Sequence, residues 1–144
     1  MNKAQLTSKC LFAGGVAELV VAVLHFVMPL PFSTTGEFAQ LSENYWSFVI
    51  LATIAIGLCM VVFGILSIYF SRKLLEGEKS AWVFGLSQGL LWLGRTLFEL
   101  ILPVKIPLFF LSNPTVLILP LCILLTLLFL VPIIVFREDL TIGE

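Results

Sequence analysis

Long apolar runs separated by short polar or proline-containing segments are the main pattern along this chain. Four runs are each long enough to form a helix that crosses a bilayer, which takes roughly 20 apolar residues. Pro29 and Pro31 mark the end of the first run because proline interrupts helical hydrogen bonds, and Asn113-Pro114 is a helix-start signal before the fourth. The pattern predicts an all-α membrane protein, a four-transmembrane-helix bundle, with spans at about 10–30, 46–70, 81–104 and 115–136.

The basic residues of the short connections predict the orientation of this bundle. They gather on one side of the predicted spans, whereas the other side carries Lys105 alone. Because short connections rich in lysine and arginine stay in the cytoplasm, we expect both termini to be cytoplasmic (N-in/C-in) in a plasma or inner membrane. The residues on the expected cytoplasmic side are Lys3, Lys9, Arg72, Lys73, Lys79 and Arg137.

Composition narrows the chemistry that this chain can carry. Of its 144 residues, 60% are hydrophobic and 12% are charged, which is too apolar for an ordinary water-facing surface. Four spans with short connections account for the whole sequence, so we interpret residues 1–144 as a single integral membrane domain. A net charge of −1 argues against a nucleic-acid partner. The sequence has no cofactor fingerprint and no metal-ligand pattern, and we expect no cofactor and no metal.

Four ionisable residues fall inside the predicted spans: Glu18 and His25 in the first, and Arg95 and Glu99 in the third. Such residues cost a few kcal/mol each in hydrocarbon, so they normally face the bundle interior and have partners. Glu18 and His25 are two helical turns apart on one face of the first predicted span. Trp92 lies on the same face of the third predicted span as Arg95 and Glu99. At about 1.5 Å of rise per residue, Arg95 lies between Glu18 and His25 in depth. We therefore expect one polar cluster in the outer half of the bundle.

This cluster has two interpretations. In a scaffold, Arg95 neutralises Glu99 or Glu18, and the polar residues hold the first and third spans together. In a binding site, Arg95 holds an anionic group, the glutamates carry protons or bind a cation, and His25 exchanges a proton near neutral pH. Burying so many ionisable groups is a costly way to fix helix register, which favours a site. The candidate ligand-binding residues are Glu18, His25, Trp92, Arg95 and Glu99, and no catalytic residue is assigned.

The segment Gly85-Leu86-Ser87-Gln88-Gly89 matches the G-x-S-x-G pattern of soluble hydrolases. It lies inside the third predicted span, and helix rise separates Ser87 from His25 by about 15 Å in depth. A catalytic Ser–His pair is therefore excluded. The two glycines are better interpreted as a small-x-x-x-small pattern that lets helices pack closely.

One feature of the first span resembles a known family. The glutamate of Ala17-Glu18-Leu19-Val20, in the first of four short spans, resembles the arrangement in the small multidrug-resistance exporters. The resemblance covers little more than one helix, and it implies the exchange of a drug for a proton at Glu18. This chain is longer than those exporters and adds His25, Arg95 and Glu99. We therefore assign it to no family.

The leading hypothesis is a small polytopic membrane protein whose polar cluster binds a lipid-like or amphipathic molecule, as an accessory subunit or a homo-oligomer. A channel is disfavoured because spans 2 and 4 offer no charged lining, which leaves polar walls on only two helices. Two alternatives stay open, namely a proton-coupled transporter with a membrane-embedded glutamate and an intramembrane acid–base enzyme with a lipid-soluble substrate. A binding role is favoured over an enzymatic one. The expected partners are the lipid bilayer, a lipid-like small molecule and a membrane protein.

Overall fold

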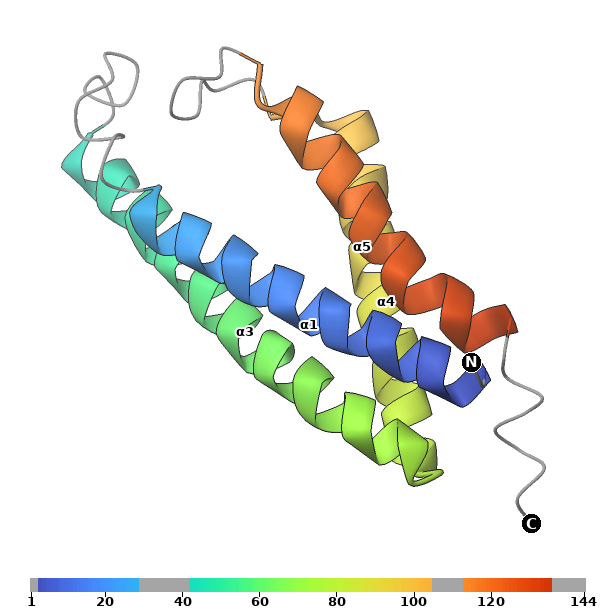
Figure 1. Ribbon diagram of the computed structural model, residues 1–144. Helices are drawn as coiled ribbons and strands as arrows, with labels where there is room; N and C mark the ends of the chain where they lie inside the picture. Colours follow the sequence, from blue (N-terminus) through green and yellow to red (C-terminus); the bar gives the residue numbers. More distant parts are fainter. Residues whose placement is uncertain (1–2, 29–41, 105–112, 136–144) are drawn as a thin grey trace.

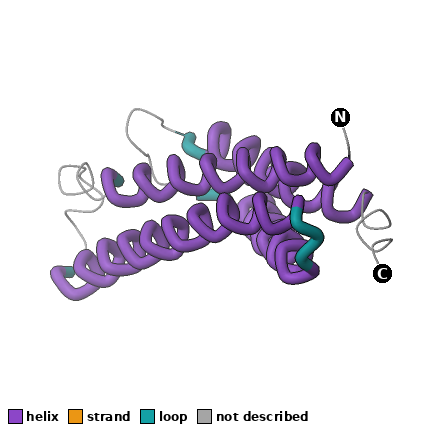
Figure 2. Tube along the Cα trace, turned by 60° about the horizontal axis from the view of Figure 1, so that its bottom comes forward, coloured by secondary structure: helices purple, strands orange, loops and turns teal. Residues whose placement is uncertain are grey.

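The computed structural model describes residues 3–28, 42–104 and 113–135 (Figure 1). Figure 2 shows helices and no strand in these ranges. The prediction of an all-α protein is therefore confirmed. The helices are α1 (Lys3–Val27), α3 (Glu43–Leu75), α4 (Lys79–Ile101) and α5 (Thr115–Val135).

Three of these helices, α1, α3 and α5, are long and apolar enough to cross a membrane. The fourth, α4, has 23 residues and would extend about 35 Å, but polar side chains interrupt its apolar sequence. The described helices support a membrane protein with three candidate membrane-crossing helices. The polar residues within α4 include Ser87, Gln88, Arg95, Thr96 and Glu99.

The helices begin and end at different residues from the predicted spans. α1 begins at Lys3, before the apolar run that starts near Cys10, and α3 continues beyond Phe70 to Leu75. The prediction followed the apolar residues alone, whereas a helix extends into its polar flanks wherever its backbone hydrogen bonds continue. α5 begins at Thr115, directly after the helix-start signal. The predicted ends at residues 30 and 136 lie outside the described residues.

The helices form two antiparallel pairs. α1 lies along α3, and α4 lies along α5, while the two pairs touch through α1 with α5 and through α3 with α4. Figure 1 shows that the pairs come together where α1 begins and α3 ends, and that they spread apart where α1 ends and α3 begins. These two ends are termed the closed end and the open end. The fold is therefore two helical hairpins that cross near the closed end.

A tight connection joins α3 to α4 at the closed end. Gly77 has a φ of 79°, in the left-handed region that favours glycine, and its N–H donates to the Leu74 carbonyl at 3.2 Å. The Lys73 ammonium donates to Glu78 at 2.9 Å, and this hydrogen bond holds the pKa of the Glu78 carboxyl below its ordinary value. Turn geometry and charge pairing therefore both fix the reversal of the chain.

Glycine allows the close approach of α1 and α3. A Cβ atom at Gly15 would lie 2.8 Å from the Gly64 carbonyl oxygen, and one at Gly64 would lie 2.9 Å from the Gly15 carbonyl oxygen. The two backbones therefore touch at this point, as small residues permit in membrane helix pairs. Further toward the closed end, the Ser8 hydroxyl donates to the Ser71 carbonyl at 2.6 Å.

The G-x-S-x-G segment has the packing role expected from its glycines. Cβ atoms at Gly85 and Gly89 would lie 2.8 Å and 2.5 Å from side chains of α5. Ser87 is exposed and donates to the Val83 carbonyl of its own helix at 2.9 Å. The packing interpretation is therefore confirmed, and the serine faces away from the bundle.

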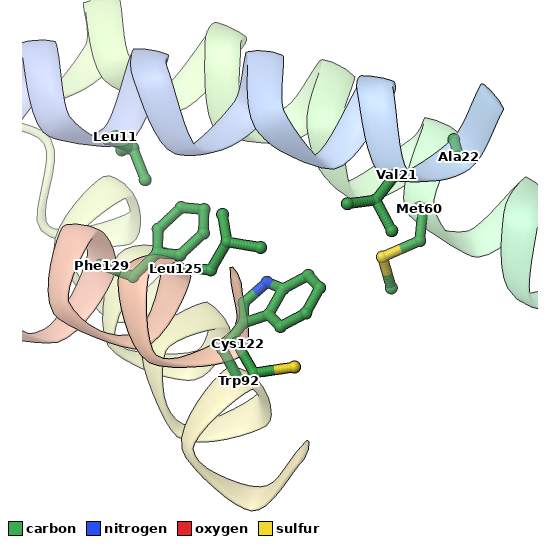
Figure 3. Packing of buried hydrophobic residues seen from close by; sticks show 8 residues of the cluster. All are labelled: Leu11, Val21, Ala22, Met60, Trp92, Cys122, Leu125 and Phe129. Atoms are coloured by element: carbon green, nitrogen blue, oxygen red, sulfur yellow. The ribbon is translucent and has the colours of Figure 1, made fainter. Parts of the chain in front are cut away.

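The hydrophobic core lies where the two hairpins cross. Figure 3 shows residues of α1 and α3 facing residues of α4 and α5 across this region. Trp92 stands near the middle of the cluster with 5% of its surface exposed, while Val21 and Met60 lie on the side toward the ends of the hairpins that spread apart. The buried members of the cluster are Leu11, Val21, Ala22, Met60, Trp92, Cys122, Leu125 and Phe129.

Candidate functional site

Two separate groups of polar residues lie in the interior of the bundle. One joins α1, α3 and α4 within the hairpin crossing, and the other joins the end of α4 to the start of α5 near the open end. The sequence predicted one cluster, whereas the structure divides four of its members between these two groups and leaves His25 outside both. The Glu18 site consists of Glu18, Ser67 and Trp92, and the Arg95 site consists of Arg95, Glu99 and Thr115.

The Glu18 carboxyl group is fully buried, and both of its oxygens have hydrogen-bond donors. Glu18 is 0% exposed. The Ser67 hydroxyl donates to Oε2 at 3.0 Å, and the Trp92 indole N–H donates to Oε1 at 2.9 Å. Because the three residues come from three helices, the carboxyl group links both hairpins at their crossing.

Local packing explains why a residue of α3 reaches Glu18. Gly15 and Gly64 hold the backbones of α1 and α3 in contact. A Cβ atom at Gly15 would lie 2.8 Å from the Ser67 Cβ atom, and Glu18 follows Gly15 by about one helical turn. The short serine side chain can therefore bridge the helices. In the rest of the crossing, Phe84 of α4 stacks on an aromatic ring of α3 at a centroid distance of 4.7 Å.

Gln88 is another interior polar residue of α4, one turn before Trp92 on the same face. Only 3% of its surface is exposed. Its carbonyl oxygen, Oε1, is buried and has no hydrogen-bond partner among the described residues. A buried polar atom of this kind costs free energy unless a partner meets it.

The Arg95 site is built around the Glu99 carboxyl group. Arg95 Nη2 donates to Glu99 Oε2 at 2.7 Å, across one turn of α4. The other oxygen, Oε1, accepts from the Thr115 hydroxyl at 2.9 Å and from the Val104 backbone N–H at 3.1 Å. Glu99 therefore ties the end of α4 to the start of α5, and it has three donors of which only one is charged.

The two members of this ion pair are buried to very different extents. The Glu99 side chain is 0% exposed, whereas the Arg95 side chain is 37% exposed. A guanidinium group carries five N–H donors, and Glu99 is the one hydrogen-bond partner of Arg95 in the described part of the chain. Arg95 therefore has donors available for another anion.

His25 lies apart from both sites. Its Nδ1 is 2.8 Å from the Val21 carbonyl oxygen of its own helix, and its Cβ would contact a side chain added at Gly57 of α3. Within the described ranges, no hydrogen bond joins His25 to Glu18, Arg95 or Glu99. The ring is half-buried, which leaves Nε2 as the nitrogen that can meet a further partner.

Sequence reasoning missed the uncharged partners of both sites. The expectation of polar walls on only two helices is wrong, because α3 contributes Ser67 and α5 contributes Thr115 to the buried carboxyl groups. A threonine pair, Thr96 and Thr126, also joins α4 to α5 with its hydroxyl oxygens 3.1 Å apart. A lone serine or threonine in an apolar run was the available signal, but such residues often bond only to their own helix.

The geometry places hydrogen-bonded carboxyl groups in the interior, and beside one of them the partly exposed guanidinium of Arg95. Within the described ranges, no group of three histidine, cysteine or acidic residues is placed to hold a metal ion. The arrangement can bind an anion at Arg95 and can hold or exchange a proton at Glu18. No protein-family model, curated protein or solved structure matches this chain.

Proposed function

We propose that this protein crosses the bilayer four times and binds the anionic head group of a lipid-like, amphipathic molecule at the Arg95 site. The unequal burial of the Arg95–Glu99 pair carries the proposal, since the carboxyl group is enclosed and the guanidinium is 37% exposed. A cation placed among apolar helices is costly when its donors lack partners. A phosphate or carboxylate head group would supply them, because the guanidinium fork matches the geometry of such anions.

The four-span topology is part of the same proposal. Besides the three apolar helices, α4 is long enough to cross the bilayer, and it packs along α5 over a close glycine contact. Four antiparallel helices would place the start of α1 and the end of α5 on one side, at the closed end (Figure 1). Arg72, Lys73 and Lys79 lie at this end, which favours a cytoplasmic closed end and an outer open end.

The open end offers the surroundings that an amphipathic molecule needs. The hairpins spread apart there (Figure 1), and residues of α4 beyond the crossing are strongly exposed, including Phe98 at 64% and Ile101 at 73%. Acyl chains would cover such apolar side chains while the head group stays at Arg95. His25, half-buried on the other hairpin, lies two turns beyond Glu18 toward the same end.

The other hypotheses have less support. An acid–base enzyme would need His25 close to a glutamate, whereas its Nδ1 bonds to the Val21 carbonyl. Proton-coupled transport would depend on Glu18 or Glu99, whose exposed fractions are 0% and 1%. Head-group binding at Arg95 requires neither acid–base catalysis by His25 nor proton transport by a glutamate.

Thermal unfolding in an uncharged detergent tests the proposal. Phosphatidylglycerol should raise the Tm of the wild-type protein, and phosphatidylcholine of the same chain length should raise it less. At ten times the Kd the expected stabilisation is about 1.4 kcal/mol. Glycerol phosphate, which has no acyl chains, distinguishes a lipid site from a site for a free phosphate ester. It should raise the Tm as much as phosphatidylglycerol only if the site binds the free ester.

Arg95→Gln is the informative variant because it removes the charge and retains a hydrogen-bonding side chain. It should lose the difference between the two phospholipids. Ser87→Ala, on the exposed face of the same helix, is the matched control and should retain that difference. Equal shifts by both lipids in the wild type, or an unchanged difference in Arg95→Gln, would contradict the proposal.

A further inference from the structure

The buried carbonyl oxygen of Gln88 has no hydrogen-bond partner among the described residues, and it belongs to the helix whose Trp92 donates to Glu18. Gln88 is 3% exposed, and its Oε1 has no hydrogen-bond partner among the described residues. It is one turn before Trp92 on the same face of α4, and Trp92 donates to Glu18. Long side chains of a helix lean toward its N-terminal end, so the Trp92 ring extends over the turn that carries Gln88.

The hydrogen-bond requirements of the two forms of a carboxyl group differ in one respect. An ionised carboxylate only accepts, and Ser67 and Trp92 supply one donor to each oxygen of Glu18. A protonated carboxyl group keeps accepting capacity but also has an O–H that must donate. Glu18 therefore has two donors, and Gln88 Oε1, one helical turn before Trp92, is a buried acceptor without a partner.

We propose that Glu18 alternates between an ionised and a protonated form, and that Gln88 Oε1 accepts the O–H of the protonated form. In this step one proton binds to a carboxylate oxygen, the charge of Glu18 changes from −1 to 0, and no bond between heavy atoms forms or breaks. The Ser67 and Trp92 hydrogen bonds persist in both forms. The proposal concerns the Glu18 site and does not depend on lipid binding at Arg95.

Buried hydroxyl groups mark the side from which the proton would come. Ser67 is 0% exposed, and Ser71, one turn further along α3 toward the closed end, is 2% exposed. The Ser8 hydroxyl of α1 donates to the Ser71 carbonyl at 2.6 Å. These groups form a polar seam between α1 and α3 that leads from the closed end to Glu18.

Few other ionisable groups face Glu18 from the helices packed around it. On its own helix His25 is two turns away, and on α4 Arg95 follows Trp92 by one turn and is paired with Glu99. α5 contributes the buried thiol of Cys122, and the α3 residue in contact is the uncharged Ser67. Removing the Arg95–Glu99 pair together should therefore shift the protonation of Glu18 less than removing Gln88.

Infrared spectroscopy of the full chain in lipid vesicles tests this proposal. Protonated glutamic acid has a carboxyl C=O stretching band that the ionised form lacks, and the band of Glu18 is assigned by its loss in Glu18→Gln. We expect this band to grow as the pH falls. In Gln88→Met it should move to higher frequency, because the O–H loses its acceptor, while Ser87→Ala should leave it unmoved.

A double-mutant cycle provides a second measurement that does not need the band. The amide of Glu18→Gln resembles the protonated carboxyl group because its NH2 can donate to Gln88. Glu18→Gln should therefore lower the Tm by roughly 2–4 °C more in a Gln88→Met background than in the wild type. Additive Tm changes, or a Glu18 band that Gln88→Met does not move, would overturn the proposal. The absence of a Glu18 band at every pH where the protein stays folded would also overturn it.

Discussion

Trp92 of α4 donates its indole N–H to the Glu18 carboxyl group of α1 at 2.9 Å, across 74 positions of the sequence. This bond crosses from one helical hairpin to the other, and Ser67 adds the third helix to it. Hydrogen bonds that satisfy a buried carboxyl group are worth more to the fold than bonds at a surface. The Glu18 site should therefore determine how firmly the two hairpins are held together.

Removing either donor should weaken the fold. Ser67→Ala deletes the hydroxyl without adding bulk, and Trp92→Phe keeps a ring but removes the N–H. Each should lower the free energy of unfolding by about 1.5–3 kcal/mol, as expected for a bond to a carboxyl group. Titration with a denaturing detergent, followed by circular dichroism, measures the change. Ser87→Ala is the control, and a Ser67→Ala loss no larger than that of the control would show that the bond contributes little.

Arg95→Ala should destabilise the protein more than Arg95→Lys. Alanine leaves the enclosed Glu99 with only the Thr115 and Val104 donors, whereas lysine keeps the positive charge but loses the planar fork. The loss for alanine should be roughly 1–3 kcal/mol, below the value for a fully buried pair because the Arg95 side chain is more than a third exposed. The same unfolding titration gives both values. Identical stabilities of wild type and Arg95→Ala would mean that Glu99 needs no cation.

Two helical glycines should respond oppositely to the same substitution. A Cβ atom at Gly64 would lie 2.9 Å from the Gly15 carbonyl oxygen, so Gly64→Ala should push α1 away from α3 and destabilise the fold. At Gly94 nothing lies within 4 Å, so Gly94→Ala should be neutral or stabilise by up to about 1 kcal/mol through helix propensity. A stable Gly64→Ala protein would contradict the close contact of the first hairpin.

Single cysteines introduced without the native thiols test the membrane topology. Glu78→Cys at the closed end should react with an impermeant maleimide only after the membrane is opened. Ser42→Cys and Asn113→Cys at the open end are both exposed, and they should react in intact cells. Reaction of position 78 from outside would reverse the orientation, and opposite labelling of positions 42 and 113 would exclude the four-span arrangement.

The sequence predicted the helices and their polar faces better than it predicted the contacts between helices. Apolar runs locate helices because the bilayer sets their length, and the Arg95–Glu99 pair follows from a spacing of four within one helix. Depth counting also placed Arg95 beyond Glu18, as the Trp92–Glu18 bond shows. Depth in the membrane does not define the lateral position of a residue, however. The hairpins diverge toward the open end (Figure 1), and this divergence separates the Glu18 site from the Arg95 site.

The uncharged partners could not be predicted for a different reason. Ser67 and Thr115 acquire their roles from the rotation and contact of neighbouring helices, which depend on glycine contacts that a single sequence does not pair. Thr53 illustrates the ambiguity, because its hydroxyl donates to the Val49 carbonyl of its own helix at 2.8 Å. The same residue type thus bonds to a neighbouring helix at one position and only to its own helix at another.

Photo-crosslinking with a phosphatidylglycerol that carries a diazirine next to its head group tests head-group binding at Arg95 most directly. Peptide mass spectrometry of the protein in vesicles would locate the attached lipid. We expect attachment to concentrate on α4 around Arg95, and to fall to the level of the other lipid-facing helices in Arg95→Gln. An even distribution over all the helices in the wild type, or the same concentrated pattern in Arg95→Gln, would contradict the proposed site.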